Sequence, residues 1–210
     1  MKHLLSLLIT ALIFSTSGSS FAGDGFLGSD LKTVQATDFF KFFCLKKAYD
    51  SKGDKPDEVR FNYTSQGEYK GLEMLGLVVG KSHHEVRKTL IAVTRKFIDD
   101  PASGVFAADF VKSFLSQGLS SRDAQLMGGL IHQISEYKPE GMKVIYAQPE
   151  NHGESFKGSP KLIKANADGY RVFRGKKEEQ DYKLMDCTLK IFNVEPADGE
   201  KGLALVIEPS

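Results

Sequence analysis

The chain opens with an apolar run unlike anything that follows it. Lys2 precedes the run, Leu4 to Phe14 is almost wholly apolar or small, and Ser20-Phe21-Ala22 places small residues at the two positions that define a cleavage site. The run is too short to span a bilayer, and no later stretch approaches about 20 consecutive apolar residues. We therefore predict a secretory signal peptide over residues 1–22, followed by an exported mature chain.

Two apolar patterns occupy the next part of the chain. Between Thr37 and Tyr49 the apolar side chains cover slightly more than half of a helical circumference, although they also suit a strand buried on both faces. We predict a helix there. Val59, Phe61 and Tyr63 then alternate with polar residues, which predicts a strand, and an apolar run ending at Val79 predicts its hairpin partner.

The middle of the chain carries three segments with apolar positions at helical spacing. The first follows a capping box formed by Ser82 and Glu85. The three apolar stripes are Val86, Leu90, Val93 and Phe97; then Phe106, Phe110 and Phe114; and then Leu126, Leu130, Ile134 and Tyr137. This spacing predicts three consecutive amphipathic helices.

After Met142 the apolar period changes from about four to two. The predicted strands are Lys143–Tyr146, Leu162-Ile163, Tyr170–Phe173 after an Asp168-Gly169 turn, Met185–Ile191, and Leu203–Ile207 after an Asp198-Gly199 turn. The expected fold is α+β, with an N-terminal helix and hairpin, three central amphipathic helices and a mainly antiparallel C-terminal sheet. No low-complexity linker divides residues 23–210, which predicts a single domain.

The balance of charged residues argues against nucleic-acid binding and does not indicate any other function. The 28 basic and 27 acidic residues give a formal net charge of +1. The signal peptide holds one Lys and no acid, so the mature chain has 28 − 1 = 27 basic and 27 acidic residues. Without a broad basic surface we expect no nucleic-acid partner, and without a second apolar run we expect no stable membrane insertion after processing.

Export affects the expected oxidation state of the two cysteines, Cys44 and Cys187. Oxidising compartments favour disulfides, so we predict a bridge between them that joins the early aromatic segment to a late strand. The alternative is two buried free thiols. A bridge enclosing so long a loop stabilises a protein by about 4–5 kcal/mol in the chain-entropy model.

Residues with catalytic potential are few. His84 lies in the predicted first central helix, and His152, Glu154 and Ser155 lie in a glycine- and proline-containing loop where functional groups often gather. The zinc-protease histidine spacing is absent, and no fingerprint of a bound cofactor is present, so we expect neither metal nor cofactor. For each of these four side chains, a packed or solvated group without a catalytic role is the simpler interpretation.

Two sets of residues have binding potential. Lys88 and Arg95 align on one side of the predicted first central helix, where they could receive an acidic partner or simply form a solvated face. Phe39 and Phe43 could line an apolar pocket or belong to the core.

These observations favour an exported, non-catalytic binding protein that recognises a protein or a glycan, in the manner of a periplasmic or secreted accessory, inhibitor or effector. Two alternatives remain. One is a cofactor-independent hydrolase that uses His84 or His152 as its base. The other is a carrier whose phenylalanine-rich segment encloses a small apolar ligand.

Overall fold

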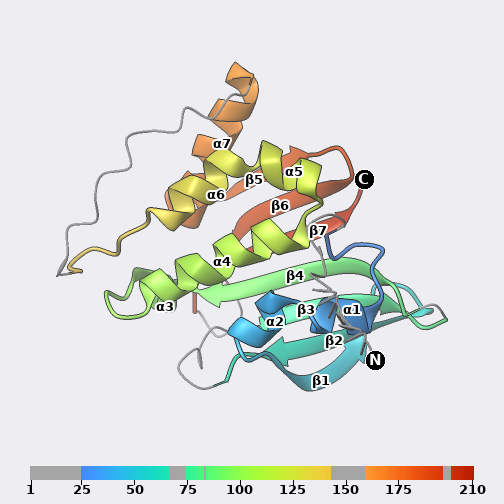
Figure 1. Ribbon diagram of the computed structural model, residues 1–210. Helices are drawn as coiled ribbons and strands as arrows, with labels where there is room; N and C mark the ends of the chain where they lie inside the picture. Colours follow the sequence, from blue (N-terminus) through green and yellow to red (C-terminus); the bar gives the residue numbers. More distant parts are fainter. Residues whose placement is uncertain (1–24, 67–73, 83, 143–158, 196–199) are drawn as a thin grey trace, which may run out of the picture.

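The computed structural model describes residues 25–66, 74–82, 84–142, 159–195 and 200–210. The described residues form seven helices and one seven-stranded antiparallel sheet (Figure 1). The strands are β1 (Lys46–Lys52), β2 (Glu58–Thr64), β3 (Met74–Gly80), β4 (Val86–Thr94), β5 (Glu179–Lys183), β6 (Cys187–Val194) and β7 (Gly202–Pro209). The helices are α1 (Leu31–Gln35), α2 (Asp38–Phe42), α3 (Arg95–Asp99), α4 (Gly104–Gly118), α5 (Ser121–Leu126), α6 (Gly128–Ser135) and α7 (Pro160–Phe173). The predicted α+β class is confirmed.

The sheet order is β1-β2-β3-β4-β7-β6-β5. The first four strands form one meander and the last three another, and β4 pairs with β7 to join them. Between β4 and β5 the chain forms α3 to α7, which lie with the two short N-terminal helices along one side of the sheet (Figure 1). The sheet therefore has one face covered by helices and one face that no described helix covers.

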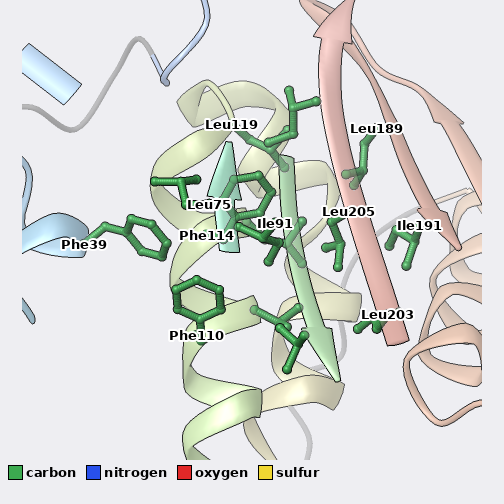
Figure 2. Close-up of a cluster of buried hydrophobic side chains, with 14 of the residues drawn as sticks. Phe39, Leu75, Ile91, Phe110, Phe114, Leu119, Leu189, Ile191, Leu203 and Leu205 are labelled. Carbon is green, nitrogen blue, oxygen red and sulfur yellow. The ribbon is translucent and has the colours of Figure 1, made fainter. Parts of the chain in front are cut away.

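The core fills the space between the helices and the covered face of the sheet. Side chains that lie opposite one another across five strands form one of its rows: Tyr63, Leu75, Ile91, Leu205 and Ile191. Rings from α2 and α4 pack onto this row, and Figure 2 shows Phe39, Phe110 and Phe114 pointing toward it. This continuous apolar layer supplies the main driving force for packing the helices on the sheet.

The predicted helix over Thr37–Tyr49 is much shorter in the structure. Helix α2 ends at Phe42, Cys44 adopts a left-handed backbone conformation with φ of 49°, and β1 begins at Lys46. The break is physically reasonable because a left-handed residue cannot continue a right-handed helix. The predicted hairpin that follows is confirmed, since β2 and β3 pair antiparallel.

The first predicted central helix is wrong over most of its length. Residues Val86–Thr94 form β4, and only Arg95–Asp99 are helical. Strand β4 lies near the middle of the sheet and carries apolar residues toward both faces, with Ile91 in the core and Leu90 on the opposite side. Because β4 has apolar residues on both faces, the alternation of apolar and polar residues expected of a half-buried strand is absent. The apolar residues also happen to recur about every four positions, which resembles the pattern of a helix.

The other two predicted central helices are present, with a change. Helix α4 buries Phe110 and Phe114 and ends at Gly118, as expected. The third stripe is divided at Met127 into α5 and α6. Tyr137 lies beyond the end of α6, where its hydroxyl donates to the carbonyl oxygen of Ile98 at 3.1 Å.

The predicted strands at Leu162-Ile163 and Tyr170–Phe173 are also wrong, because both lie in α7. The supposed turn residue Gly169 is inside this helix, where its missing side chain leaves room for Tyr182. The Tyr182 hydroxyl donates to the carbonyl oxygen of Ala165 at 2.7 Å. Gly169 therefore permits the close packing of Tyr182 against α7 and does not reverse the chain.

The end of the chain follows the prediction more closely. Strand β6 begins at Cys187, so Met185 precedes it, and β6 pairs antiparallel with β7, which contains Leu203–Ile207. Two predicted features, the strand Lys143–Tyr146 and the Asp198-Gly199 turn, lie outside the described residues.

The predicted disulfide does not form in this structure. Both thiols are free, with Cys44 exposed and Cys187 buried. Cys44 leads into β1 whereas Cys187 begins β6, and these strands are five inter-strand steps apart, or roughly 24 Å. A disulfide requires Cα atoms within about 7 Å, so the fold keeps the two cysteines apart.

The two thiols should differ strongly in reactivity. Burial raises the pKa of Cys187 to about 12, and the Asp123 carboxylate adds to the shift, so almost no thiolate exists at pH 8. In the native protein we expect rapid labelling of Cys44 by a disulfide reagent and labelling of Cys187 only after unfolding. A count of reactive thiols before and after adding denaturant measures this. Two blocked thiols in the non-reduced, unfolded protein would instead reveal the bridge.

Candidate functional site: a charged cleft at the end of the sheet

A cleft of ≈ 740 Å³ lies where β4 ends and where β5 and β7 begin. Its volume falls within the range of about 300–1,000 Å³ typical of small-ligand sites. Charged side chains from five parts of the fold dominate its lining: Arg95, Asp99, Arg174, Lys176, Lys177, Glu178, Glu179, Glu195 and Lys201. Phe192 and Asn193 of β6 contribute an aromatic ring and an amide.

One wall of the cleft is built by the end of α7. Helix α7 begins with Ser159 as its N-cap and Pro160 in its first turn, and it ends where Gly175 adopts a φ of 67°. The Gly175 N–H donates to the Val172 carbonyl and the Lys176 N–H donates to the Arg171 carbonyl. These two bonds form a Schellman motif, which fixes the turn that carries Arg174, Lys176 and Lys177 into the cleft.

Arg95 joins this helix end to the sheet. Its guanidinium, mostly buried, donates to the carbonyl oxygens of Val172 and Phe173 and to Asn193 Oδ1, the last at 2.6 Å. Asn193 Nδ2 in turn donates to the carbonyl oxygens of Val172 and Lys177 at 3.2 and 2.7 Å. Desolvation lowers the pKa of Arg95, but its reference value is so high that the charge remains at neutral pH. The side chains of Arg95 and Asn193 therefore stabilise the lining of the cleft, and their hydrogen-bonding groups are already engaged with one another and with the backbone.

The remaining charged groups are differently engaged. Arg174 lies over the Tyr137 ring, 5.1 Å from its centre, while Lys177 pairs with Asp168 at 3.1 Å and Lys201 with Glu195 at 3.2 Å. Lys176, Glu178 and Glu179 are exposed and make no side-chain ion pair with the described residues. The cleft thus offers an available ammonium donor beside two available carboxylate acceptors.

Lys88, the other predicted cationic binding residue, lies far from Arg95 at the opposite end of β4. Its ammonium contacts Asp54 at 2.9 Å and Glu208 at 3.3 Å, and Lys190 contacts Glu208 at 2.6 Å. The two predicted residues share no helix face, because Lys88 lies in strand β4 whereas Arg95 is the first residue of α3. Lys88 therefore belongs to a row of paired charges formed by Asp54, Lys88, Glu208 and Lys190. Its ammonium is already paired and is not free to bind an acidic partner.

This row should make the fold sensitive to acid. The hydrogen bond from Lys88 lowers the pKa of Asp54, and the hydrogen bond from Lys190 lowers that of Glu208. Carboxyl groups with depressed folded-state pKa values stabilise the fold above their unfolded values of about 4, and this stabilisation is lost as the pH falls through the folded values. We expect the melting temperature to fall progressively below about pH 5. The pH dependence should be flatter in Lys88→Gln, and an equal slope in both proteins would contradict this assignment.

The other predicted site residues are not brought together. His84 is exposed in the turn before β4, with a φ of 54°, and its backbone carbonyl accepts from the Leu31 N–H. Phe39 and Phe43 are fully buried core residues surrounded by other rings. The three loop candidates, His152, Glu154 and Ser155, lie outside the described residues.

A second, smaller cavity of ≈ 440 Å³ lies at the opposite end of the sheet beside Ser120, Asp186 and Cys187. Behind it, the buried Asp123 carboxylate accepts from the backbone N–H groups of Met185 and Asp186 at 2.8 and 3.0 Å, and from the Cys187 thiol at 3.4 Å. Ser120 Oγ donates to Asp186 at 2.6 Å. These contacts hold the β5–β6 turn against α5, so we assign these residues a role in stabilising the fold.

Fold and cleft together define a two-layer α+β protein with a mixed-charge cleft at one end of its antiparallel sheet. Within the described ranges no three His, Cys, Asp or Glu side chains are grouped so that they could hold a metal ion. No helix in the same part of the chain combines the length and apolar character needed to cross a membrane. The chain matches no family model, no curated protein and no solved structure.

Sequence reasoning missed most of the cleft. The apolar spacing predicts a strand over Tyr170–Phe173, whereas these residues end α7, so the sequence pattern does not indicate that Arg174, Lys176 and Glu179 line one cleft. The signal was nevertheless present: Ser159-Pro160 is a helix start, and Gly175 after a basic residue is a helix stop.

Proposed function

We propose that this is an exported, non-catalytic binding protein that recognises a glycan through the charged cleft. The observation that carries the proposal is the juxtaposition, in one cleft, of available donors and available acceptors with an aromatic ring. Export rests on the N-terminal sequence pattern described above.

The mixed charge favours hydroxyl-bearing ligands. Lys176 can only donate hydrogen bonds, whereas Glu178 and Glu179 in their ionised forms can only accept them. A simple anion would meet repulsion from the two carboxylates, and a simple cation would meet repulsion from the ammonium. A sugar hydroxyl both donates and accepts, so a saccharide can satisfy both kinds of partner at once.

The aromatic ring of Phe192 provides an apolar surface for the C–H groups of a sugar. Phe192 lines the cleft and is only partly buried, so part of its ring surface can contact the C–H groups of a sugar. Such sites combine an apolar surface with a few polar groups that fix the ligand's orientation. Because Arg95 and Asn193 hold the floor through five hydrogen bonds, the cleft is formed before a ligand arrives.

The test is calorimetric titration with three trisaccharides, made respectively of glucose, N-acetylglucosamine and galacturonic acid. We expect saturable binding of at least one neutral sugar. Loss of a hydrogen bond to a charged group costs about 1.5 kcal/mol, so Lys176→Ala and Glu179→Ala should each weaken binding about tenfold.

Matched controls separate the cleft from general charge effects. Lys161 and Glu136 are exposed residues outside the cleft lining, and their alanine variants make the same charge changes. These controls should bind as the native protein does. Equal loss in controls and cleft variants, or binding of none of the three sugars, would refute the proposal.

A further inference from the structure

The smaller cavity, of ≈ 440 Å³, is a candidate site separate from the charged cleft. It shares no lining residue with the cleft and lies at the opposite end of the sheet, where β6 begins and β7 ends. Its volume falls within the range of about 300–1,000 Å³ for small-ligand sites. Four separate parts of the chain meet there, and they contribute Leu27, Ser120, Arg122, Asp186, Cys187 and Ile207.

Hydrogen bonds between these parts hold the walls of the cavity in place. The Phe26 N–H donates to the Gly118 carbonyl oxygen at 3.0 Å, which fixes the segment that carries Leu27 against the end of α4. Ser120 Oγ donates to Asp186 Oδ2 at 2.6 Å, which joins the start of α5 to the β5–β6 turn. The cavity is therefore formed before a ligand arrives, so little ordering of the protein opposes binding.

Two opposite charges line the cavity without pairing with each other. Arg122 is exposed, and its guanidinium has no carboxylate partner among the described residues. The Asp186 carboxylate is also exposed, and among the described residues it accepts only the Ser120 hydroxyl, through Oδ2. A guanidinium only donates hydrogen bonds and an ionised carboxylate only accepts them. The cavity thus presents one cation and one anion that a ligand can engage.

Apolar groups form another part of the lining. Leu27 is half-buried and packs against the core, while Ile207 and Cys187 are buried in β7 and β6. Burial raises the pKa of the Cys187 thiol to about 12, so the thiol stays neutral and behaves as a small apolar group. An aliphatic part of a ligand can therefore cover the exposed surface of Leu27.

We propose that this cavity binds a free α-amino acid with an aliphatic side chain. Arg122 pairs with the carboxylate of the ligand and Asp186 with its ammonium, while the aliphatic side chain contacts Leu27. A simple anion is repelled by Asp186 and a simple cation by Arg122, so the two charges together select a zwitterion. The described lining includes no aromatic ring, which distinguishes the cavity from the charged cleft and disfavours a sugar.

Titration of the processed, isotope-labelled protein with L-leucine, followed by backbone amide shifts, tests the proposal. Isocaproate is leucine without the ammonium, and isoamylamine is leucine without the carboxylate. We expect leucine to bind with a dissociation constant below about 1 mM, and each analogue to bind about tenfold more weakly because it loses one charge-assisted contact. L-Alanine keeps both charges but loses most of the aliphatic surface, so it should also bind about tenfold more weakly.

Charge-removing variants assign each ligand group to its partner. Arg122→Gln should weaken leucine binding about tenfold without weakening isoamylamine binding, because the amine has no carboxylate to lose. Asp186→Asn keeps an acceptor for Ser120 Oγ, and it should weaken leucine binding about tenfold without weakening isocaproate binding. Arg171→Gln and Asp181→Asn make the same charge changes at exposed positions outside the cavity, and both should bind leucine as the native protein does.

All four substitutions replace exposed side chains, and circular dichroism confirms that each variant is folded. No saturable shifts at about 10 mM leucine, or shifts grouped away from Arg122 and Asp186, would overturn the proposal. A folded Arg122→Gln protein that binds leucine as tightly as the native protein would also overturn it. None of these outcomes bears on glycan binding, because the ligands contain no sugar and the variants leave the cleft unchanged.

Discussion

Replacing Asp123 with alanine is expected to lower the free energy of unfolding by about 3 kcal/mol. The Asp123 carboxylate is fully buried and accepts hydrogen bonds from Met185 N–H, Asp186 N–H and the Cys187 thiol. Alanine removes every one of these acceptors, so donors in the β5–β6 turn lose their partner and the turn separates from α5. Chemical denaturation followed by circular dichroism measures the loss.

Two control variants test whether the loss of stability comes from the missing Asp123 carboxylate. Asp123→Asn keeps an acceptor oxygen and a similar shape, so we expect a smaller loss of about 1–2 kcal/mol. Asp186→Ala removes an exposed carboxylate that accepts only from Ser120 Oγ among the described hydrogen bonds, and should cost less than about 1 kcal/mol. In Asp123→Ala the Cys187 thiol should also become easier to label. If all three variants were equally stable, the carboxylate would have no role in holding the turn.

Replacing Phe39 with alanine should cost about 3–5 kcal/mol. The Phe39 side chain is fully buried, and its ring centre lies 5.2 Å from that of Phe110 and 6.1 Å from that of Phe114. Figure 2 shows the Phe39 ring pointing toward these two rings. Alanine leaves a cavity where α2 meets α4. For a chain of this size each 1 kcal/mol corresponds to about 2–4 °C in melting temperature, so calorimetry resolves the effect easily.

Phe42→Ala is the matched control, because it removes the same ring from the same helix. The Phe42 side chain is 57% exposed and packs edge-on against Phe43. Its removal should cost less than about 1.5 kcal/mol. Similar losses in the two variants would show that α2 does not present Phe39 to the core as described.

The difference between Phe39 and Phe42 illustrates what could be predicted from sequence. The helical segment itself was recognisable, but its end depended on the left-handed conformation of Cys44, for which a cysteine gives no local signal. Strand β4 was misread because Leu90 and Ala92 are apolar on the face opposite the core. Apolar residues on both faces of a central strand remove the alternation on which sequence-based recognition of a strand depends.

The candidate site was less predictable than the fold. The cleft depends on Arg95 reaching the end of α7 across nearly eighty positions of sequence, and no local pattern reports such a contact. The helix face predicted for Lys88 and Arg95 does not exist, because Lys88 lies in β4 and Arg95 begins α3. By contrast, Ser159, Pro160 and Gly175 are ordinary capping signals for a helix, and they indicate correctly that Lys176 follows the end of α7.

Glycan recognition in the charged cleft is the central claim, and chemical-shift mapping tests it most directly. The isotope-labelled protein is titrated with the trisaccharide that binds most tightly in calorimetry, and backbone amide shifts are followed. The account predicts saturable shifts grouped at Lys176, Glu179, Phe192 and Lys201, with Lys161 and Glu136 unaffected. Shifts centred on the smaller cavity beside Ser120, or no shifts at saturating sugar, would contradict it.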